Sequence, residues 1–287
     1  MTMIVKIENE QLITEINSFG SELHSLKSKH TGVEYLWQGD PAVWSGRSPI
    51  LFPIVGRLKG DSCRHEGKEY TLPKHGFART MEFQKAGSSR DKAVFSLRSN
   101  GDTMAAFPFD FELKVTFVLN GCAIEVLHEV INHSDSAMYF SIGAHPGFNC
   151  EIGDYLEFAK EETLSAEKID EDAMVIDRRF PVLEHSRVIP ITADIFKADA
   201  LILSGYQSNM VCLKSPRHNR ELRFDFKEAP FLGLWAKPGA PYVCIEPWYG
   251  VNDSSGAAGE LAEKRGIQKL NPSERFAFSW SAKVVEP

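Results

Sequence analysis

Apolar and polar side chains alternate with a period of two residues along several segments of this chain. The clearest are residues 111–119, 221–227 and 275–284. Successive side chains of a strand point to opposite faces, so this period is typical of strands with one buried face. Weaker alternation recurs at residues 12–16, 23–27, 93–99 and 122–131, and turn sequences separate the segments, namely Thr31-Gly32, Glu66-Gly67 and Asn120-Gly121. The sequence predicts one long antiparallel all-β unit.

Helical periodicity is almost absent. Only residues 102–106 are expected to form a helical turn, and without helices between strands a parallel sheet of βαβ units is excluded. Residues 161–187 are rich in charge, and we expect them to run over the surface. No composition break or internal repeat divides the chain. We therefore predict a single domain over residues 1–287, built as a large antiparallel β-sandwich with a concave sheet face available to a ligand.

Composition and charge exclude several classes of function. The 287 residues carry a formal net charge of -7, which gives no electrostatic reason to bind nucleic acid. The first nine residues lack the pattern of a signal peptide, and the longest apolar run, residues 49–55, is too short to span a bilayer. We expect a cytoplasmic protein without nucleic-acid or membrane partners, and the sequence makes no prediction of its oligomeric state.

Metal and cofactor motifs are missing from the sequence. The five cysteines are widely spaced and include no Cys-x-x-Cys pair, which predicts free, mostly buried thiols. The phosphate-binding, dinucleotide-binding, serine-hydrolase and zinc-protease motifs do not occur, and the nine histidines form no convincing metal set. We expect neither a metal nor a cofactor.

Four short segments concentrate polar side chains among Gly, Pro and aromatic residues. In the first, Arg57 follows an apolar run and a glycine, so its side chain is presented at the end of a strand. A guanidinium in such a place suits bidentate contact with an anion or with several hydroxyls. The alternative is an ordinary surface arginine.

The second and third segments each carry a histidine in a stiff loop. His75 precedes Gly76, which allows a close backbone turn, and His145 follows an expected strand and precedes Pro146. Rigid mounting of this kind suits acid-base catalysis. The alternative is that both histidines are structural residues.

The fourth segment, residues 231–250, is the most informative. Glu246 ends the expected apolar strand and precedes Pro247 and Trp248, so its carboxylate is placed in an aromatic, partly dry setting. Desolvation raises the pKa of a carboxyl and makes it a better acid or base near neutrality. Five aromatic residues could stack on a sugar ring or simply fill the core: Trp37, Trp44, Trp235, Trp248 and Tyr249. Together these residues indicate proton transfer on a polyhydroxylated ligand.

Five motifs carry these residues in a fixed order: Trp37-x-Gly39-Asp40-Pro41, Leu51-Phe-Pro-Ile-Val-Gly-Arg57, His75-Gly-Phe-Ala-Arg79, His145-Pro-Gly-Phe-Asn149, and Gly233-x-Trp235-x-Lys-Pro-Gly-Ala with Glu246-Pro-Trp. The ordered set spans residues 37–250 and resembles the aldose 1-epimerase (galactose mutarotase-like) family, within it the LacX-type branch. The resemblance implies a β-supersandwich fold and a mechanism without a cofactor.

The resemblance also implies a role for each candidate residue. In the family, a glutamate takes the proton from the anomeric hydroxyl while a histidine protonates the ring oxygen, and the sugar ring opens and closes again. Glu246 matches the base and His145 the acid. His75 matches a second histidine that steadies charge near the ring oxygen. The substrate-binding residues are expected to be Arg57, Asp199, Arg79 and Trp235.

The identity of the sugar stays open at this point. The motif from His75 to Arg79 also resembles hexose-6-phosphate mutarotases, so Arg57, Lys59 and Arg79 are candidates for an anion site. The alternative for Arg79 is a structural ion pair. The expected function is therefore an aldose 1-epimerase for a hexose or a hexose phosphate. Two other classes stay open: a non-catalytic carbohydrate-binding protein with the same fold, and a glycosidase or polysaccharide lyase with Asp199 as its second carboxylate.

Overall fold

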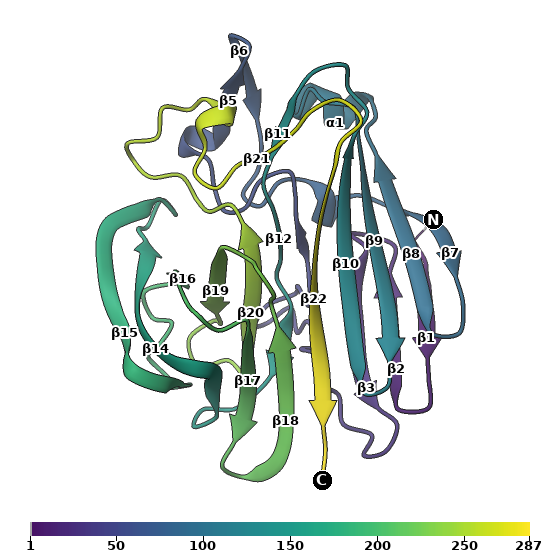
Figure 1. Ribbon diagram of the computed structural model, residues 1–287, viewed down its shortest axis with the longest axis vertical. Helices are drawn as coiled ribbons and strands as arrows, with labels where there is room; N and C mark the ends of the chain where they lie inside the picture. The colour runs from purple at the N-terminus through teal and green to yellow at the C-terminus, as the bar shows by residue number, and fades with distance from the viewer. Residues whose placement is uncertain (1) are drawn as a thin grey trace.

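The computed structural model describes residues 2–287, and one antiparallel sheet of 15 strands dominates it (Figure 1). The main path of this sheet crosses, in order, β4 (Ile50–Leu51), β12 (Ile142–Ala144), β20 (Tyr242–Tyr249), β19 (Phe231–Trp235), β16 (Leu201–Ser204), β14 (Tyr155–Ile169), β17 (Met210–Ser215), β18 (His218–Asp225), β22 (Arg275–Val285), β10 (Ala123–Asn132), β9 (Phe111–Asn120), β8 (Lys92–Arg98) and β7 (Gln84–Ser88). Beside it, β13 (Gly147–Asn149) pairs with β20 and β15 (Val175–Pro190) pairs with β14. The predicted all-β fold is confirmed.

Three small sheets and a few short helical turns complete the described chain. The sheets are β1 (Ile4–Glu8) with β2 (Leu12–Asn17) and β3 (Glu22–Ser28), β5 (Ser62–His65) with β6 (Lys68–Thr71), and β11 (Met138–Phe140) with β21 (Gln268–Leu270). The predicted helical turn is α1 (Gly101–Ala106), where the Asn100 side chain accepts hydrogen bonds from two backbone N–H groups of the first turn. Three 3₁₀ turns remain, namely η1 (Lys59–Asp61), η2 (Ala78–Thr80) and η3 (Leu261–Glu263).

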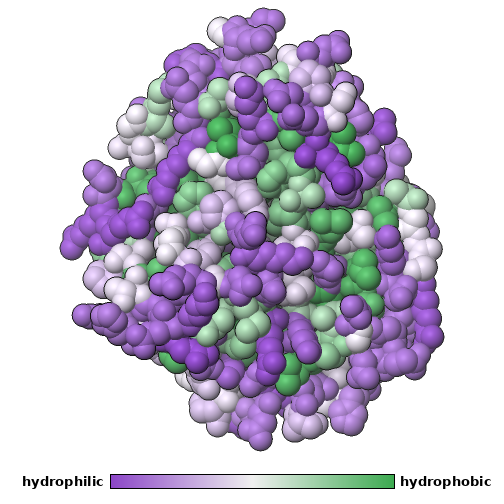
Figure 2. All heavy atoms as spheres, viewed as in Figure 1, coloured by the Kyte–Doolittle hydropathy of each residue, from purple (hydrophilic) through white to green (hydrophobic). Residues whose placement is uncertain are grey.

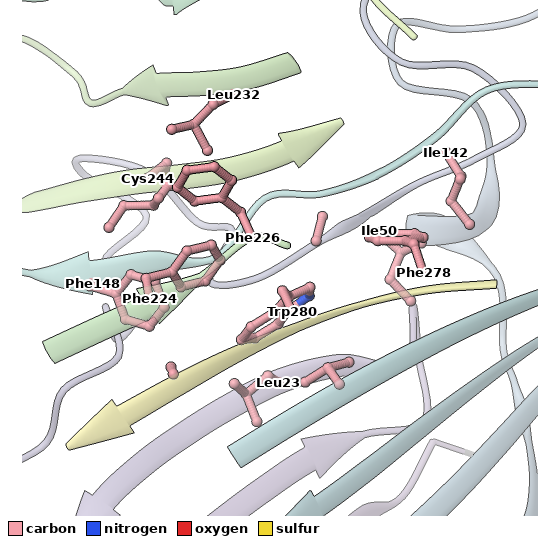
Figure 3. Packing of buried hydrophobic residues seen from close by; sticks show 14 of the residues in the cluster. Leu23, Ile50, Ile142, Phe148, Phe224, Phe226, Leu232, Cys244, Phe278 and Trp280 are labelled. Carbon is pink, nitrogen blue, oxygen red and sulfur yellow. The ribbon is translucent and has the colours of Figure 1, made fainter. Parts of the chain in front are cut away.

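The alternating segments supply the core. In β22, every second residue from Phe278 onward is buried, as the period of two predicts. The Trp280 ring stacks on Phe224 of β18 with ring centroids 5.3 Å apart, and Leu23 of β3 lies on the other side of Trp280 (Figure 3). The small sheet β1–β3 and the large sheet therefore share one interior, and burial of apolar area there is the main stabilising term.

Residues 161–187 differ from the sequence prediction. Most of them belong to the long hairpin of β14 and β15, which stands at one side of the molecule (Figure 1). The hairpin is not only a surface excursion, because Glu162 is buried and accepts hydrogen bonds from the backbone N–H groups of Gln207 and Ser208. Its turn, residues 170–174, is called the hairpin tip below.

The cysteines are free and mostly buried, as the sequence predicted. All five cysteines are free; four are buried, and Cys122 is half-buried. Polar side chains cover most of the face shown in Figure 2, with apolar residues between them. Among residues 2–287, no helix is both long enough and apolar enough to cross a membrane.

The strand order brings the candidate segments together. The strands β4, β12, β20, β19 and β16 are neighbours at one end of the large sheet. Glu246 lies in β20, His145 lies between β12 and β13, and Asp199 precedes β16. Segments far apart in the sequence therefore meet over one part of the sheet.

Candidate active site

A pocket of about 190 Å³ lies over this part of the sheet. Six of the seven predicted site residues line it, namely Glu246, His145, His75, Asp199, Arg79 and Trp235, and Arg57 does not. Further lining residues were given no site role from the sequence, among them Lys74, Trp44 and Asn252.

Glu246 and His145 form the centre of the pocket. Gly143 pairs with Trp248 and Gly147 with Cys244, so this register places His145 opposite Glu246. The Nε2 atom of His145 lies 3.3 Å from Oε2 of Glu246. Strand β20 continues through Tyr249, so Glu246 lies within the strand and not at its end as the sequence suggested.

Burial sets the protonation of this pair. Glu246 is 1% exposed, and desolvation raises the pKa of its carboxyl well above 4.5; the Trp248 indole and the Lys74 ammonium act weakly in the opposite direction. Burial likewise lowers the pKa of His145 to about 3. Both groups are therefore driven toward their neutral forms, and the pair holds one exchangeable proton near neutral pH.

Two glycines make room for the Trp248 ring beside Glu246. A Cβ atom on Gly143 would lie 2.6 Å from Cδ1 of Trp248, and one on Gly233 would lie 2.6 Å from its Cζ2. These glycines belong to β12 and β19, the two strands that flank this part of β20. Side chains two residues apart on a strand share a face, so the indole lies beside the carboxylate.

His75 reaches the pocket from a left-handed backbone turn. His75 and Gly76 have φ values of 68° and 69°, and a Cβ atom on Gly76 would lie 2.2 Å from the carbonyl oxygen of Phe52. Only glycine fits so close to Phe52, the residue that directly follows β4. The predicted stiff loop is therefore present, and the His75 and His145 ring centroids are 5.9 Å apart.

Aromatic residues form one wall of the pocket. The Trp44 ring lies 5.1 Å from His145 and 5.6 Å from Trp235 between centroids. Of the five aromatics singled out from the sequence, Trp44, Trp235 and Trp248 line the pocket. Trp37 instead stacks on Tyr242, and Tyr249 packs against Phe276 and Phe278.

Two cationic side chains line the pocket without a carboxylate partner. Arg79 donates a hydrogen bond to the backbone carbonyl of Lys74, and neither side chain forms a salt bridge within residues 2–287. Burial lowers the pKa of the Arg79 guanidinium from its usual value. A half-buried guanidinium without a counter-ion is unusual, because charge taken out of water is normally paired. The expected alternative of a structural ion pair at Arg79 is not seen.

Arg57 lies outside the pocket lining. Its guanidinium forms a two-bond fork with the carboxylate of Asp61, both at 2.7 Å, and its Nη1 lies 3.4 Å from the backbone oxygen of Asp172 in the hairpin tip. The Lys59 side chain does not line the pocket either. Direct contact of Arg57 with a sugar thus stays a prediction.

One set of three donors lies in the pocket region. His145, Cys244 and Glu246 each offer an atom within 4.8 Å of the others, a grouping that the sequence spacing did not suggest. Burial raises the pKa of the Cys244 thiol well above 9, whereas the thiolate is the form that binds metal. The donor set therefore suits a resident metal poorly.

A larger cavity of about 650 Å³ shares one lining residue, Asn252, with this pocket. The charged groups that line it are partly engaged with each other: Lys264 pairs with Asp253 at 2.8 Å, and Arg265 with Glu167 at 2.8 Å. The smaller cavity contains Glu246, with a buried oxygen that lacks a hydrogen-bond partner within residues 2–287. We therefore place the candidate active site in the smaller cavity.

The fold and this pocket define a galactose mutarotase-like β-supersandwich. Among solved structures, the chain is similar to a galactose mutarotase related enzyme from Lactobacillus acidophilus, with a TM-score of 0.94, 34% identity, and 99% and 98% of the two chains covered. It is also similar to a galactose mutarotase-like protein from Lactobacillus casei, with a TM-score of 0.93, 27% identity, and 99% and 100% covered.

Sequence comparison agrees with the structural comparison. The family model for aldose 1-epimerase matches residues 3–254. The plasmid-encoded protein LacX of Lactococcus lactis subsp. lactis is 33% identical to the chain, with 99% of this chain and 100% of LacX covered. The chain belongs to the aldose 1-epimerase family, as its motifs predicted.

Proposed function

We propose that this protein is an aldose 1-epimerase that interconverts the α and β anomers of a hexose or a hexose phosphate. The observation that supports it is the placement of a buried carboxyl, Glu246, 3.3 Å from His145, with His75 lining the same pocket. Anomer exchange needs a proton removed at one oxygen and another delivered at its neighbour, and this pair can do both.

The proton balance of the reaction fits the pair. The proton held by Glu246 in the neutral pair first passes to His145; Glu246 as carboxylate then takes the proton of the anomeric hydroxyl, and His145 as imidazolium gives its proton to the ring oxygen. The bond between C1 and the ring oxygen breaks, C1 becomes an aldehyde, and rotation about the bond to C2 exposes its other face. The sequence then reverses. Ring opening leaves Glu246 protonated and His145 neutral, the forms that burial favours.

The remaining lining residues are assigned to binding. Asp199 has a carboxylate suited to accept hydrogen bonds from ring hydroxyls, and Trp235 and Trp44 offer apolar faces for the ring. Lys74 and Arg79 are the cations available to a phosphate, so a hexose phosphate is the substrate that would neutralise them.

The test is magnetisation-transfer NMR of anomer exchange with glucose, galactose, glucose 6-phosphate and galactose 6-phosphate. Acceleration of any of them over buffer supports an aldose 1-epimerase. Saturable binding of a sugar without acceleration would instead favour the non-catalytic carbohydrate-binding alternative. Release of reducing sugar from an aryl glycoside would favour a glycosidase.

A further inference from the structure

His75 and Gly56 exchange two hydrogen bonds. The backbone N–H of His75 donates to the carbonyl oxygen of Gly56 at 2.7 Å, and the backbone N–H of Gly56 donates to Nδ1 of the His75 ring at 3.1 Å. His75 is 9% exposed, so these bonds lie in the interior. The orientation of the ring is therefore fixed by the backbone that follows β4.

This contact also fixes the tautomer of His75. A neutral imidazole has one N–H donor and one acceptor nitrogen, and Nδ1 must be the acceptor because it faces an amide N–H. The ring proton is then on Nε2, which has no hydrogen-bond partner within residues 2–287. His75 lines the pocket, and Nε2 is its one ring nitrogen that the Gly56 amide does not engage.

The surroundings of His75 oppose a second proton. Burial is the main reason that its pKa lies well below 6.5, and the charged or titratable groups around it, His145, Lys74 and Arg79, act in the same direction. Protonation of Nδ1 would also set two N–H groups, those of the ring and of Gly56, against each other.

We propose that His75 is a fixed, neutral hydrogen-bond donor through Nε2, and that the Gly56 amide is the positioning group that sets this tautomer. The substrate atom that faces His75 must then be an acceptor, as a ring oxygen is and a hydroxyl hydrogen is not. His75 itself carries no proton through the reaction, which leaves Glu246 and His145 as the proton carriers. The substrate part of this inference rests on the proposed function; the tautomer does not.

Gly56 is suited to this role by both conformation and space. Its φ is +73°, and a Cβ atom there would lie 2.1 Å from Oδ1 of Asn252. No other residue fits without a shift of Asn252, which itself donates a hydrogen bond to the carbonyl oxygen of Ala173 at 2.8 Å. The Gly56 amide that faces His75 is therefore fixed both by the backbone conformation of Gly56 and by its close packing against Asn252.

The first test is the side-chain ¹⁵N spectrum of the whole protein without ligand. The His75 signals are identified by their loss in His75→Gln. We expect an unprotonated Nδ1 and a protonated Nε2 that persist on acidification from about pH 7 to about pH 5, where a free histidine becomes charged. A proton on Nδ1, or a His75 cation within this range, would overturn the proposal. Activity is not needed for this readout.

The second test compares two amide variants. The side-chain amide of Gln reaches the place of Nε2, whereas that of Asn reaches only the place of Nδ1. Loss of a positioned donor typically costs about 100-fold in rate, so we expect His75→Asn to lose about 100-fold in kcat/KM and His75→Gln only about tenfold. Equal losses in both folded variants would contradict a donor at Nε2.

The matched control is His128→Gln. His128 is likewise buried, at 1% exposure, but it lies in β10, stacks on Phe278 and does not line the pocket. Its substitution is expected to leave kcat/KM unchanged. If wild-type protein shows the expected tautomer but no exchange of any sugar, the proposed function fails and the assignment of His75 as a neutral donor stands.

Discussion

Glu246 and His145 face each other across paired strands, with 3.3 Å between Oε2 of the carboxyl and Nε2 of the ring. Both are buried, and both are driven toward their neutral forms. Moving one proton from the carboxyl to the imidazole leaves the net charge of the pocket unchanged, but it converts the neutral pair into a carboxylate and an imidazolium. In the proposed mechanism, ring opening returns both groups to the neutral forms that burial favours.

Replacement of Glu246 by Gln is expected to lower anomer exchange by about 100-fold to about 10,000-fold, because the amide cannot take a proton. Magnetisation-transfer NMR on the preferred sugar measures this. The raised pKa of Glu246 means that its contribution to stability is present below about pH 4.5 and is lost as the pH rises through the raised value. The free energy of unfolding of Glu246→Gln should therefore increase relative to that of the wild-type protein as the pH rises.

Anomer exchange by Glu246→Gln at the wild-type rate would show that Glu246 is not the base.

The buried histidines predict a loss of stability in acid. Burial lowers the pKa of His128 to about 3, whereas an unfolded histidine has a pKa of 6.5, so its contribution to stability is present above 6.5 and is lost as the pH falls. The loss is about 1.4 kcal/mol for each pH unit below 6.5. Denaturant unfolding at a series of pH values should show a shallower acid slope for His128→Gln than for wild type. Parallel slopes would mean that His128 is protonated in the folded state.

Arg79 should decide between free and phosphorylated sugars. If it binds phosphate, Arg79→Met should lower kcat/KM for the hexose phosphate by about tenfold or more, because a hydrogen bond to a charged group is lost. Activity on the free hexose should change little, and Arg79→Lys should keep part of the preference. An equal loss for both sugars would assign Arg79 to the pocket structure.

A substitution at Arg57 distinguishes two roles of its side chain, namely contact with the hairpin tip and direct contact with the sugar. The structure joins it to Asp61 and to the hairpin tip, which directly follows Ile169 of the pocket lining. Arg57→Gln should therefore speed hydrogen exchange of residues 170–174 and raise KM more than it lowers kcat. Asp61→Asn, which weakens the same fork, should do likewise. Weaker sugar binding in Arg57→Gln with unchanged exchange in the hairpin tip would point to the direct contact that the family resemblance implies.

The sequence predicted the strands well because alternation reports burial on one face directly. The residues of the pocket were identified from the order of the family motifs. Their arrangement in space was not predicted. Residues 161–187 were misjudged because a hairpin that is mostly exposed has the same charged composition as a loop. Glu162 was hidden there, since nothing local shows that its carboxylate caps the turn at Ser208.

The sequence alone did not identify Asp61 as the partner of Arg57. Asp61 lies four residues away, but their contact depends on η1, a single 3₁₀ turn that has no pattern of its own. Asn252 was missed because its importance comes from Gly56 and Ala173, both distant in sequence. Such contacts arise from tertiary packing alone.

Cys244, Glu246 and Trp248 share one face of β20 because side chains alternate along a strand. Loss or gain of a single codon between Tyr242 and Glu246 would turn the Glu246 carboxyl to the opposite face and present its neighbour in its place. Divergence of this strand is therefore restricted to substitutions. Changes of length in the hairpin tip are restricted in another way, because Ala173 and Asp172 must stay within reach of Asn252 and Arg57.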